Sequence, residues 1–421
     1  EDTLDTEPKE LPEFEQKLVA ASERYLKVAT PDAPDVVQAR FAAAMVKYQY
    51  NHFEEAADGF RRIIQDQPDH VNAPDAARLL LSSLALARNI KGLNEAAGLI
   101  GANPKLMQGD VPEIVRRINE QKDFNQCFEY EQQGRHVQAA ECFLDYVQRH
   151  PGTDLKDRSL INAGNNFFKA RLVERSLKAN SQLVNEMPGS PLAARALYNI
   201  ADTYRRLAVY SEAARIYETF VSLQPKHELT EEALRYATIF RTGLGEYDAA
   251  IKDLRKYLQL FPKSEYSASV AFDVASAYEK QGKRDQALKE YLAWLNKYGK
   301  AGGPDLYLRA HLRIARTYEG LRGGATKSLD WFRKTVAAYE ELTDEEKAKI
   351  TAAGLAAAAE AWFMEGEAAL AEVRAVELKL PEKVLVEGIT KKVELIAKAM
   401  DLLTQVETFG QANWTIAATS R

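Results

Sequence analysis

The sequence predicts an all-α protein built from stacked helical hairpins, and one regular interval carries most of that prediction. Helix-stopping residues stand 37 residues apart at Pro151, Pro188, Pro225 and Pro262, and one further step reaches Gly299 in a glycine-rich turn. Between these stops the same order of small and aromatic residues recurs. A fixed period of this length is typical of a helical repeat array, in which each unit buries its apolar face only against its neighbours.

The order of residues within a period has a simple physical reading. The clearest copy runs Ala201, Tyr204, Ala213, Tyr217, Phe220 and Pro225. Two antiparallel helices approach closely only where their side chains are small, so the alanines predict the crossing point of a hairpin. The aromatic residues fill the wedge between one hairpin and the next, glycines supply the turn, and proline ends the second helix because it lacks an N–H.

This pattern resembles the tetratricopeptide repeat (TPR) family, whose consensus has these small, aromatic and proline positions in a helix-turn-helix unit. The resemblance covers roughly residues 37–339, with a 37-residue unit in place of the family's 34. It implies a right-handed α-α superhelix, a TPR solenoid, of about eight helical hairpins followed by longer C-terminal helices. Such an array forms a single quasi-one-dimensional unit rather than separate domains.

The two ends of the chain depart from the period. Residues 1–36 predict a capping helix whose apolar face, Phe14, Leu18, Ala21 and Tyr25, covers the first repeat. Residues 340–421 predict a long helical hairpin: a capping box at Thr343 opens a helix of about thirty residues, and a second helix follows from 382 to 408. This hairpin either caps the array or bridges to a further, truncated repeat. Both ends of the sequence suggest a piece of a longer protein.

Composition and motifs exclude several classes of function. The net charge of −5 argues against a nucleic-acid binder, and the longest apolar stretch is too short to span a membrane. The six histidines are scattered and the two cysteines cannot form a four-ligand zinc site, so we expect no metal and no cofactor. The glycines of 320–324 precede a Lys-Ser pair without the spacing of a phosphate-binding loop, and the paired glutamates lie at polar helix ends. We find no catalytic constellation.

Cys127 and Cys142 have two possible interpretations. Cys127 occupies the small-residue site of a first helix, and Cys142 lies just before Phe143 on its partner helix, so the two side chains could face each other across one hairpin. The favoured interpretation is two small buried apolar side chains, and the alternative is a disulfide in an exported protein.

The resemblance also implies where a partner binds. In TPR proteins the first helices line a concave face, and carrying those positions over predicts partner-binding residues at Asn165, Phe168, Arg195, Tyr198, Asp202, Arg205, Arg206, Arg235, Phe272, Arg309 and Arg316. Arginine and aromatic side chains are usual at interfaces because they form forked hydrogen bonds and bury large areas.

We therefore expect a non-catalytic scaffold that holds a partner protein or peptide in its concave groove. The texture of the repeats also resembles bacterial envelope TPR proteins of outer-membrane assembly, division or myxobacterial gliding machinery, which favours a periplasmic or envelope location over a cytoplasmic one. Two alternatives stay open: the non-catalytic region of a larger TPR-fused enzyme, and a structural protein that assembles through its open ends.

Overall fold

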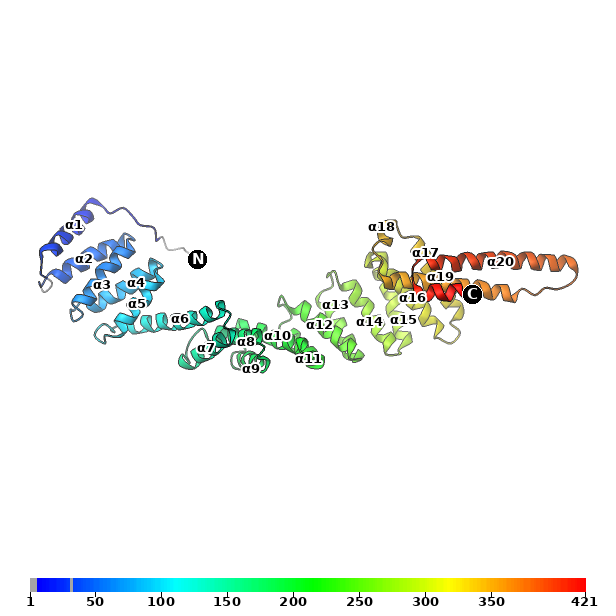
Figure 1. The fold of residues 1–421 in the computed structure, drawn as a ribbon, viewed down its shortest axis with the longest axis horizontal. Helices are drawn as coiled ribbons and strands as arrows, with labels where there is room; N and C mark the ends of the chain where they lie inside the picture. The colour runs from blue at the N-terminus through cyan, green and yellow to red at the C-terminus, as the bar shows by residue number, and fades with distance from the viewer. Residues whose placement is uncertain (1–5, 31–32) are drawn as a thin grey trace. The chain divides into compact units, whose positions relative to one another are not determined.

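The computed structural model describes residues 6–30 and 33–421, and over these residues the chain is helical throughout, without a strand. It divides into two compact units, residues 1–193 and 194–421. This division falls inside the predicted array. Residues 1–5 and 31–32 of the predicted capping region lie outside the described residues. Figure 1 shows the helices of each unit packed side by side in chain order.

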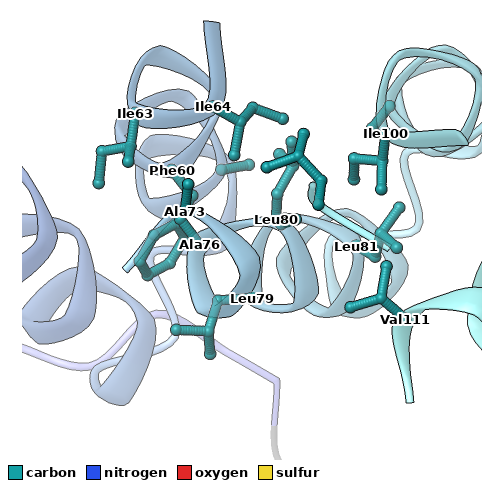
Figure 2. Close-up of a cluster of buried hydrophobic side chains, with 14 of the residues drawn as sticks. Phe60, Ile63, Ile64, Ala73, Ala76, Leu79, Leu80, Leu81, Ile100 and Val111 are labelled. Carbon is teal, nitrogen blue, oxygen red and sulfur yellow. The ribbon is translucent and has the colours of Figure 1, made fainter. Parts of the chain in front are cut away.

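The first unit holds one leading helix and four hairpins. Its helices are α1 (Glu13–Val28), α2 (Val36–Gln49), α3 (Phe53–Asp66), α4 (Ala73–Leu86), α5 (Ile90–Gly101), α6 (Val111–Gln132), α7 (His136–Arg149), α8 (Lys156–Lys169) and α9 (Val173–Glu186). Figure 2 shows one core of this unit, where Phe60 and Ile63 of α3 meet Leu80 of α4, with Ile100 of α5 and Val111 of α6 close by.

The second unit continues the hairpins and ends in a different arrangement. Its helices are α10 (Pro191–Arg206), α11 (Tyr210–Leu223), α12 (Thr230–Gly243), α13 (Tyr247–Leu260), α14 (Ser267–Lys280), α15 (Arg284–Lys297), α16 (Pro304–Glu319), α17 (Ala325–Glu340), α18 (Asp344–Lys347), α19 (Ala352–Ala375), α20 (Glu382–Thr408) and α21 (Ala412–Thr419). The first turn of α10 lies at the division between the units. The described residues thus hold eight repeat hairpins and a longer one, α19–α20, which confirms the predicted fold class.

Small residues do mark the hairpin crossings. Ala201 and Ala213 are fully buried on the two helices of one hairpin. In the first hairpin, a Cβ added to Gly59 would lie only 2.7 Å from the Cβ of Ala44. The aromatic positions also behave as predicted, because Tyr217 and Phe220 are completely buried.

The turns inside the first seven hairpins share one backbone geometry, and five of the six intervals between them are 37 residues. The residue with a left-handed φ is Asn51, Arg88, Gly134, Arg171, Ala208, Gly245 or Gly282 in successive hairpins. The next residue donates its N–H to the carbonyl five residues back, as Val209 does to Tyr204 at 2.9 Å. This is the helix-ending motif that glycine favours. Sequence inspection located it only where glycine is present.

The leading helix α1 forms as predicted but buries a different face. Val19 and Ser22 are its buried residues, whereas Phe14 is 74% exposed and Leu18 is also exposed. The predicted face of Phe14, Leu18, Ala21 and Tyr25 was therefore wrong. An apolar row at helical spacing identifies an amphipathic helix, yet packing against α2 selects which row turns inward.

The predicted helix after Thr343 is also shorter than expected. The capping box at Thr343 is present, but it opens only the single turn α18. A second start follows at Thr351, where Asp305 of α16 accepts hydrogen bonds from the backbone N–H groups of Thr351 and Gly354 at 3.1 and 3.0 Å. This tertiary cap restarts the helix as α19, which ends at Ala375 rather than near Pro381. The helix from 382 to 408 is confirmed.

Ala208 has a left-handed backbone (φ 58°) that costs a residue with a Cβ about 1–2 kcal/mol. We expect Ala208→Gly to raise the free energy of unfolding by about 1 kcal/mol, measured as a higher urea midpoint. Ala201→Gly, placed in the middle of α10, is the matched control and should lower the midpoint. An unchanged or lower urea midpoint for Ala208→Gly would contradict the left-handed backbone at Ala208.

Asp253 of α13 is 6% exposed and its Oδ2 atom lacks a hydrogen-bond partner among the described groups. Burial, and then the nearby Glu218 carboxylate, raise its pKa to about 7, although Arg241 and Lys256 act in the opposite direction. A raised carboxyl pKa means that the folded state holds the proton longer than the unfolded state. Stability from this group is therefore complete below pH 3.8 and is lost as the pH rises to about 7.

Asp253→Asn keeps the neutral form at every pH. We expect the variant to be more stable than the wild type at pH 8 by about 1–3 kcal/mol and nearly equal at pH 4, measured by urea unfolding at both values. Asp285→Asn, at an exposed site, serves as the control and should leave the pH profile unchanged. If the free energies of unfolding of the wild type and of Asp253→Asn differed by the same amount at both pH values, the ionisation of a buried Asp253 would not be the cause.

Candidate partner-binding face

Nine of the eleven predicted partner-binding residues lie on the first helices of hairpins in the second unit. We call these nine, together with Ile239, the first-helix face of unit 2: Arg195, Tyr198, Asp202, Arg205 and Arg206 on α10, Arg235 and Ile239 on α12, Phe272 on α14, and Arg309 and Arg316 on α16. Ile239 stands on α12 where Asp202 stands on α10, one 37-residue repeat later, so the repeat register alone could have identified it.

Asp202 holds two arginines at the C-terminal end of α10. Arg205 and Arg206 each donate from Nε to one of its carboxylate oxygens at 2.7 Å. Burial lowers the pKa of Arg205, but the hydrogen bonds that Arg205 donates to Asp202 outweigh that effect, and the pKa is raised. Two guanidinium groups share one carboxylate, so this corner of the face keeps a net positive charge.

An aromatic stack, which the repeat pattern did not predict, lies beside this arginine pair. The Arg205 guanidinium lies over the ring of Tyr236, 4.9 Å from its centroid. Tyr236 stacks on Phe240 with ring centroids 5.9 Å apart, and Phe240 stacks on the half-exposed Tyr210 at 4.9 Å. Tyr236 and Phe240 are four residues apart on α12, which is the spacing that could have revealed them.

Tyr198 and Phe272 form the supporting layer rather than the exposed surface. Tyr198 is 9% exposed and donates its hydroxyl to Glu232 of α12 at 2.8 Å; burial, and then that carboxylate, raise its pKa. Phe272 is 2% exposed, and the guanidinium of Arg309 lies 5.0 Å above its ring. Both aromatic rings position groups on the neighbouring helix of the face.

The remaining arginines of the face differ in how they are held. Arg235 lies over the ring of Tyr266 at 3.7 Å, a close cation–π contact. Arg316 is bound by two carboxylates, Glu319 at 2.7 Å and Glu360 of α19. Arg195 is exposed, and within residues 6–30 and 33–421 it makes no ion pair. Arg195 and Ile239 are therefore both exposed contact points on this face.

The other two predicted residues, Asn165 and Phe168, lie on α8 of the first unit. Asn165 is exposed and Phe168 is partly buried. Next to Phe168, Lys169 binds Glu131 of α6 at 2.7 Å. These residues form a separate set that belongs to the first unit alone.

Cys127 and Cys142 are joined in a disulfide that links α6 to α7, with a Cα–Cα distance of 5.4 Å. The favoured interpretation of two unlinked side chains was therefore wrong. The two cysteines stand opposite each other at the hairpin crossing, where the helices approach closely enough to be bridged. Over the described residues, no group of three or more metal-binding side chains is found, and no helix is both long and apolar enough to cross a membrane.

Comparison with known families agrees with the repeat geometry. Residues 194–227 match a family model of the tetratricopeptide repeat, and residues 233–264 match a second one. Residues 194–264 thus hold two tetratricopeptide repeats. The matched segments are the hairpins α10–α11 and α12–α13, which carry the arginine pair and the aromatic stack of the first-helix face. No curated protein matches this TPR protein in sequence.

Solved structures with similar helical arrangements include other TPR proteins. A crystal structure of MamA protein is 20% identical, with a TM-score of 0.33 over 45% of this chain and 98% of its own. A tetratricopeptide repeat protein from Parabacteroides merdae is 18% identical, with a TM-score of 0.32 over 65% and 98%. YrrB, described as a TPR protein with an unusual peptide-binding site, is 18% identical, with a TM-score of 0.32 over 48% and 94%. Similarity of this degree says nothing about what this TPR protein binds.

The disulfide closes a loop between residues 15 positions apart, and a cross-link of that span stabilises a fold by about 3 kcal/mol. We expect the double variant Cys127→Ala, Cys142→Ala to unfold at lower urea concentration than the oxidised wild type. Dithiothreitol should lower the wild-type midpoint and leave the variant unchanged. Two titratable thiols in the unreduced, unfolded wild type would show that the bond does not form.

Proposed function

We propose that this TPR protein is a non-catalytic scaffold that binds a partner protein or peptide on the first-helix face of unit 2. The observation that carries the proposal is the combination on α10 and α12 of accessible arginines, an exposed aliphatic side chain and an aromatic stack. Interfaces are enriched in these residue types, because arginine and aromatic side chains contribute most of the binding energy in well-packed contacts.

The charges of the face indicate the chemistry of the partner. Arg195, Arg206 and Arg235 present guanidinium groups, whereas Asp202 is occupied by two arginines and Glu232 by the hydroxyl of Tyr198. A segment that carries carboxylates next to apolar side chains fits this arrangement. Guanidinium groups bind carboxylates through paired hydrogen bonds, and Ile239 offers an apolar contact between them.

The disulfide supports a finer proposal about context. Structural disulfides persist in oxidising compartments and are rare in the cytosol. The Cys127–Cys142 bond therefore favours a periplasmic or envelope location, and with it a role in a multiprotein assembly of the bacterial envelope. The alternative, a non-catalytic region of a larger enzyme, predicts a catalytic domain elsewhere in the full reading frame.

The test is an affinity capture from the native lysate with the wild type and a triple variant, Arg195→Ala, Arg206→Ala, Ile239→Ala. We expect the variant to lose the principal partner, with at least about a tenfold weaker dissociation constant for that partner when it is purified. The measurement is mass spectrometry of the captured proteins, followed by calorimetry with the purified partner.

A matched control carries alanine at Arg215 and Arg255, two half-exposed arginines on the second helices α11 and α13. It should retain the partner, since these side chains lie outside the first-helix face. Equal capture by all three proteins would place the interface elsewhere and contradict the proposal.

A further inference from the structure

Helix α20 carries two apolar rows, of which only one is covered. Leu385, Gly388, Leu395, Ala399 and Leu403 form the covered row. Leu403 contacts α19 at Gly366, where an added Cβ would lie 2.8 Å from the Leu403 side chain. Figure 1 shows α20 running alongside α19. The covered row is therefore the packing face of the α19–α20 hairpin.

The second row lies next to the first on the helix surface and is exposed. We call it the α20 seam, and its members are Val386, Ile389, Val393, Ile396 and Met400. Their exposed fractions lie between 39% and 64%. Contiguous apolar surface of this kind marks an interaction site, since a single exposed apolar residue is ordinary but an unbroken row is not.

The spacing of the α20 seam is that of a coiled coil. Its members follow one another at intervals of three, four, three and four residues, so valines and Met400 occupy one heptad position and isoleucines the other. The row extends over fifteen residues, or about 21 Å of helix. This pattern selects a partner helix rather than an extended peptide, because knobs on one helix require the holes of another.

The residues that flank the α20 seam indicate which kind of helix can pack against it. On the open side lie Thr390, Ala397 and Thr404, which are small and uncharged. The acidic residues Glu387, Glu394 and Asp401 form a row further round the helix. Another helix flanked by the same small, uncharged residues can therefore approach the seam closely. Its flanking residues would not place like charges opposite one another.

We propose that the α20 seam pairs antiparallel with the α20 seam of a second copy of this chain. In the register that places Val393 against Ile396 of the second copy, Met400 lies against Ile389 of the second copy. In an antiparallel pair, a residue that flanks the seam faces the residue at the same heptad position of the other helix. Thr390 then opposes Ala397 of the second copy. No like charges meet at this position, and Ile389, Val393, Ile396 and Met400 each face an apolar residue of the second seam. Val386 lies beyond the paired part of the seam, since the position opposite it is Leu403, which packs on α19.

The dimer that results is modest in strength. One seam of fifteen residues is smaller than a standard protein interface, so we expect a reversible, concentration-dependent dimer with a dissociation constant on the order of micromolar. The seam lies outside the first-helix face, so this inference does not depend on the proposed partner binding. Two copies joined here would display two first-helix faces to one assembly.

The experiment is sedimentation velocity on the complete chain over two decades of concentration, with the variant Val393→Lys, Ile396→Lys. We expect the wild type to shift from monomer to dimer and the variant to stay monomeric, with at least about a hundredfold loss of dimer affinity. The control Val384→Lys changes an exposed valine on the opposite side of α20 and should dimerise like the wild type. Circular dichroism verifies that each variant is folded.

Cysteine cross-linking tests the register. A mixture of Val393→Cys chains and Ile396→Cys chains should form a cross-linked dimer in mild oxidant, faster than either chain by itself. A wild type that is monomeric at every concentration would overturn the proposal, including the case in which it instead sediments with phosphatidylglycerol vesicles. A dimer that survives the double lysine variant would also overturn it, and preferential cross-linking of Val393→Cys chains with each other would overturn the antiparallel register.

Discussion

The fold depends on the close approach of the two helices in each hairpin. That approach requires small side chains on both helices, and the structure leaves no space for larger ones: a methyl group added at Gly59 would clash with Ala44. Once the helices are close, the aromatic residues can project to the next hairpin, where Tyr217, Tyr257 and Tyr291 are completely buried. Each hairpin is thus incomplete without its neighbour, which is the property that makes a solenoid cooperative.

Polar contacts reinforce the stacking at nearly the same interval. Tyr198 donates to Glu232, Arg255 to Glu290 and Arg313 to Glu279, over separations of 34 or 35 residues. These contacts use side chains that would otherwise be available to a partner. The first-helix face therefore combines two kinds of residue: those that tie one repeat to the next, and a smaller number, such as Arg195 and Ile239, that remain accessible.

The C-terminal end follows a different rule because a tertiary contact replaces the repeat. Asp305 caps the start of α19 and fixes where the last long hairpin begins. α20 then extends along α19, and α21 folds back on the pair, where Trp414 packs near Phe363 with ring centroids 5.3 Å apart. The prediction that this region bridges to a further repeat stays a prediction. The α20 seam is exposed because α20 carries two apolar rows and α19 covers only one of them.

The sequence by itself determined the helical class, the repeat, the helix stops and the register of the candidate face, because each depends on local residue chemistry repeated at a fixed interval. Only the tertiary structure decided which row of α1 is buried, where the helix after Thr343 restarts, and that Cys127 and Cys142 are bonded. It also decided which candidates are accessible, burying Phe272 and exposing Ile239. These outcomes depend on contacts between residues far apart in the chain, which no local pattern specifies.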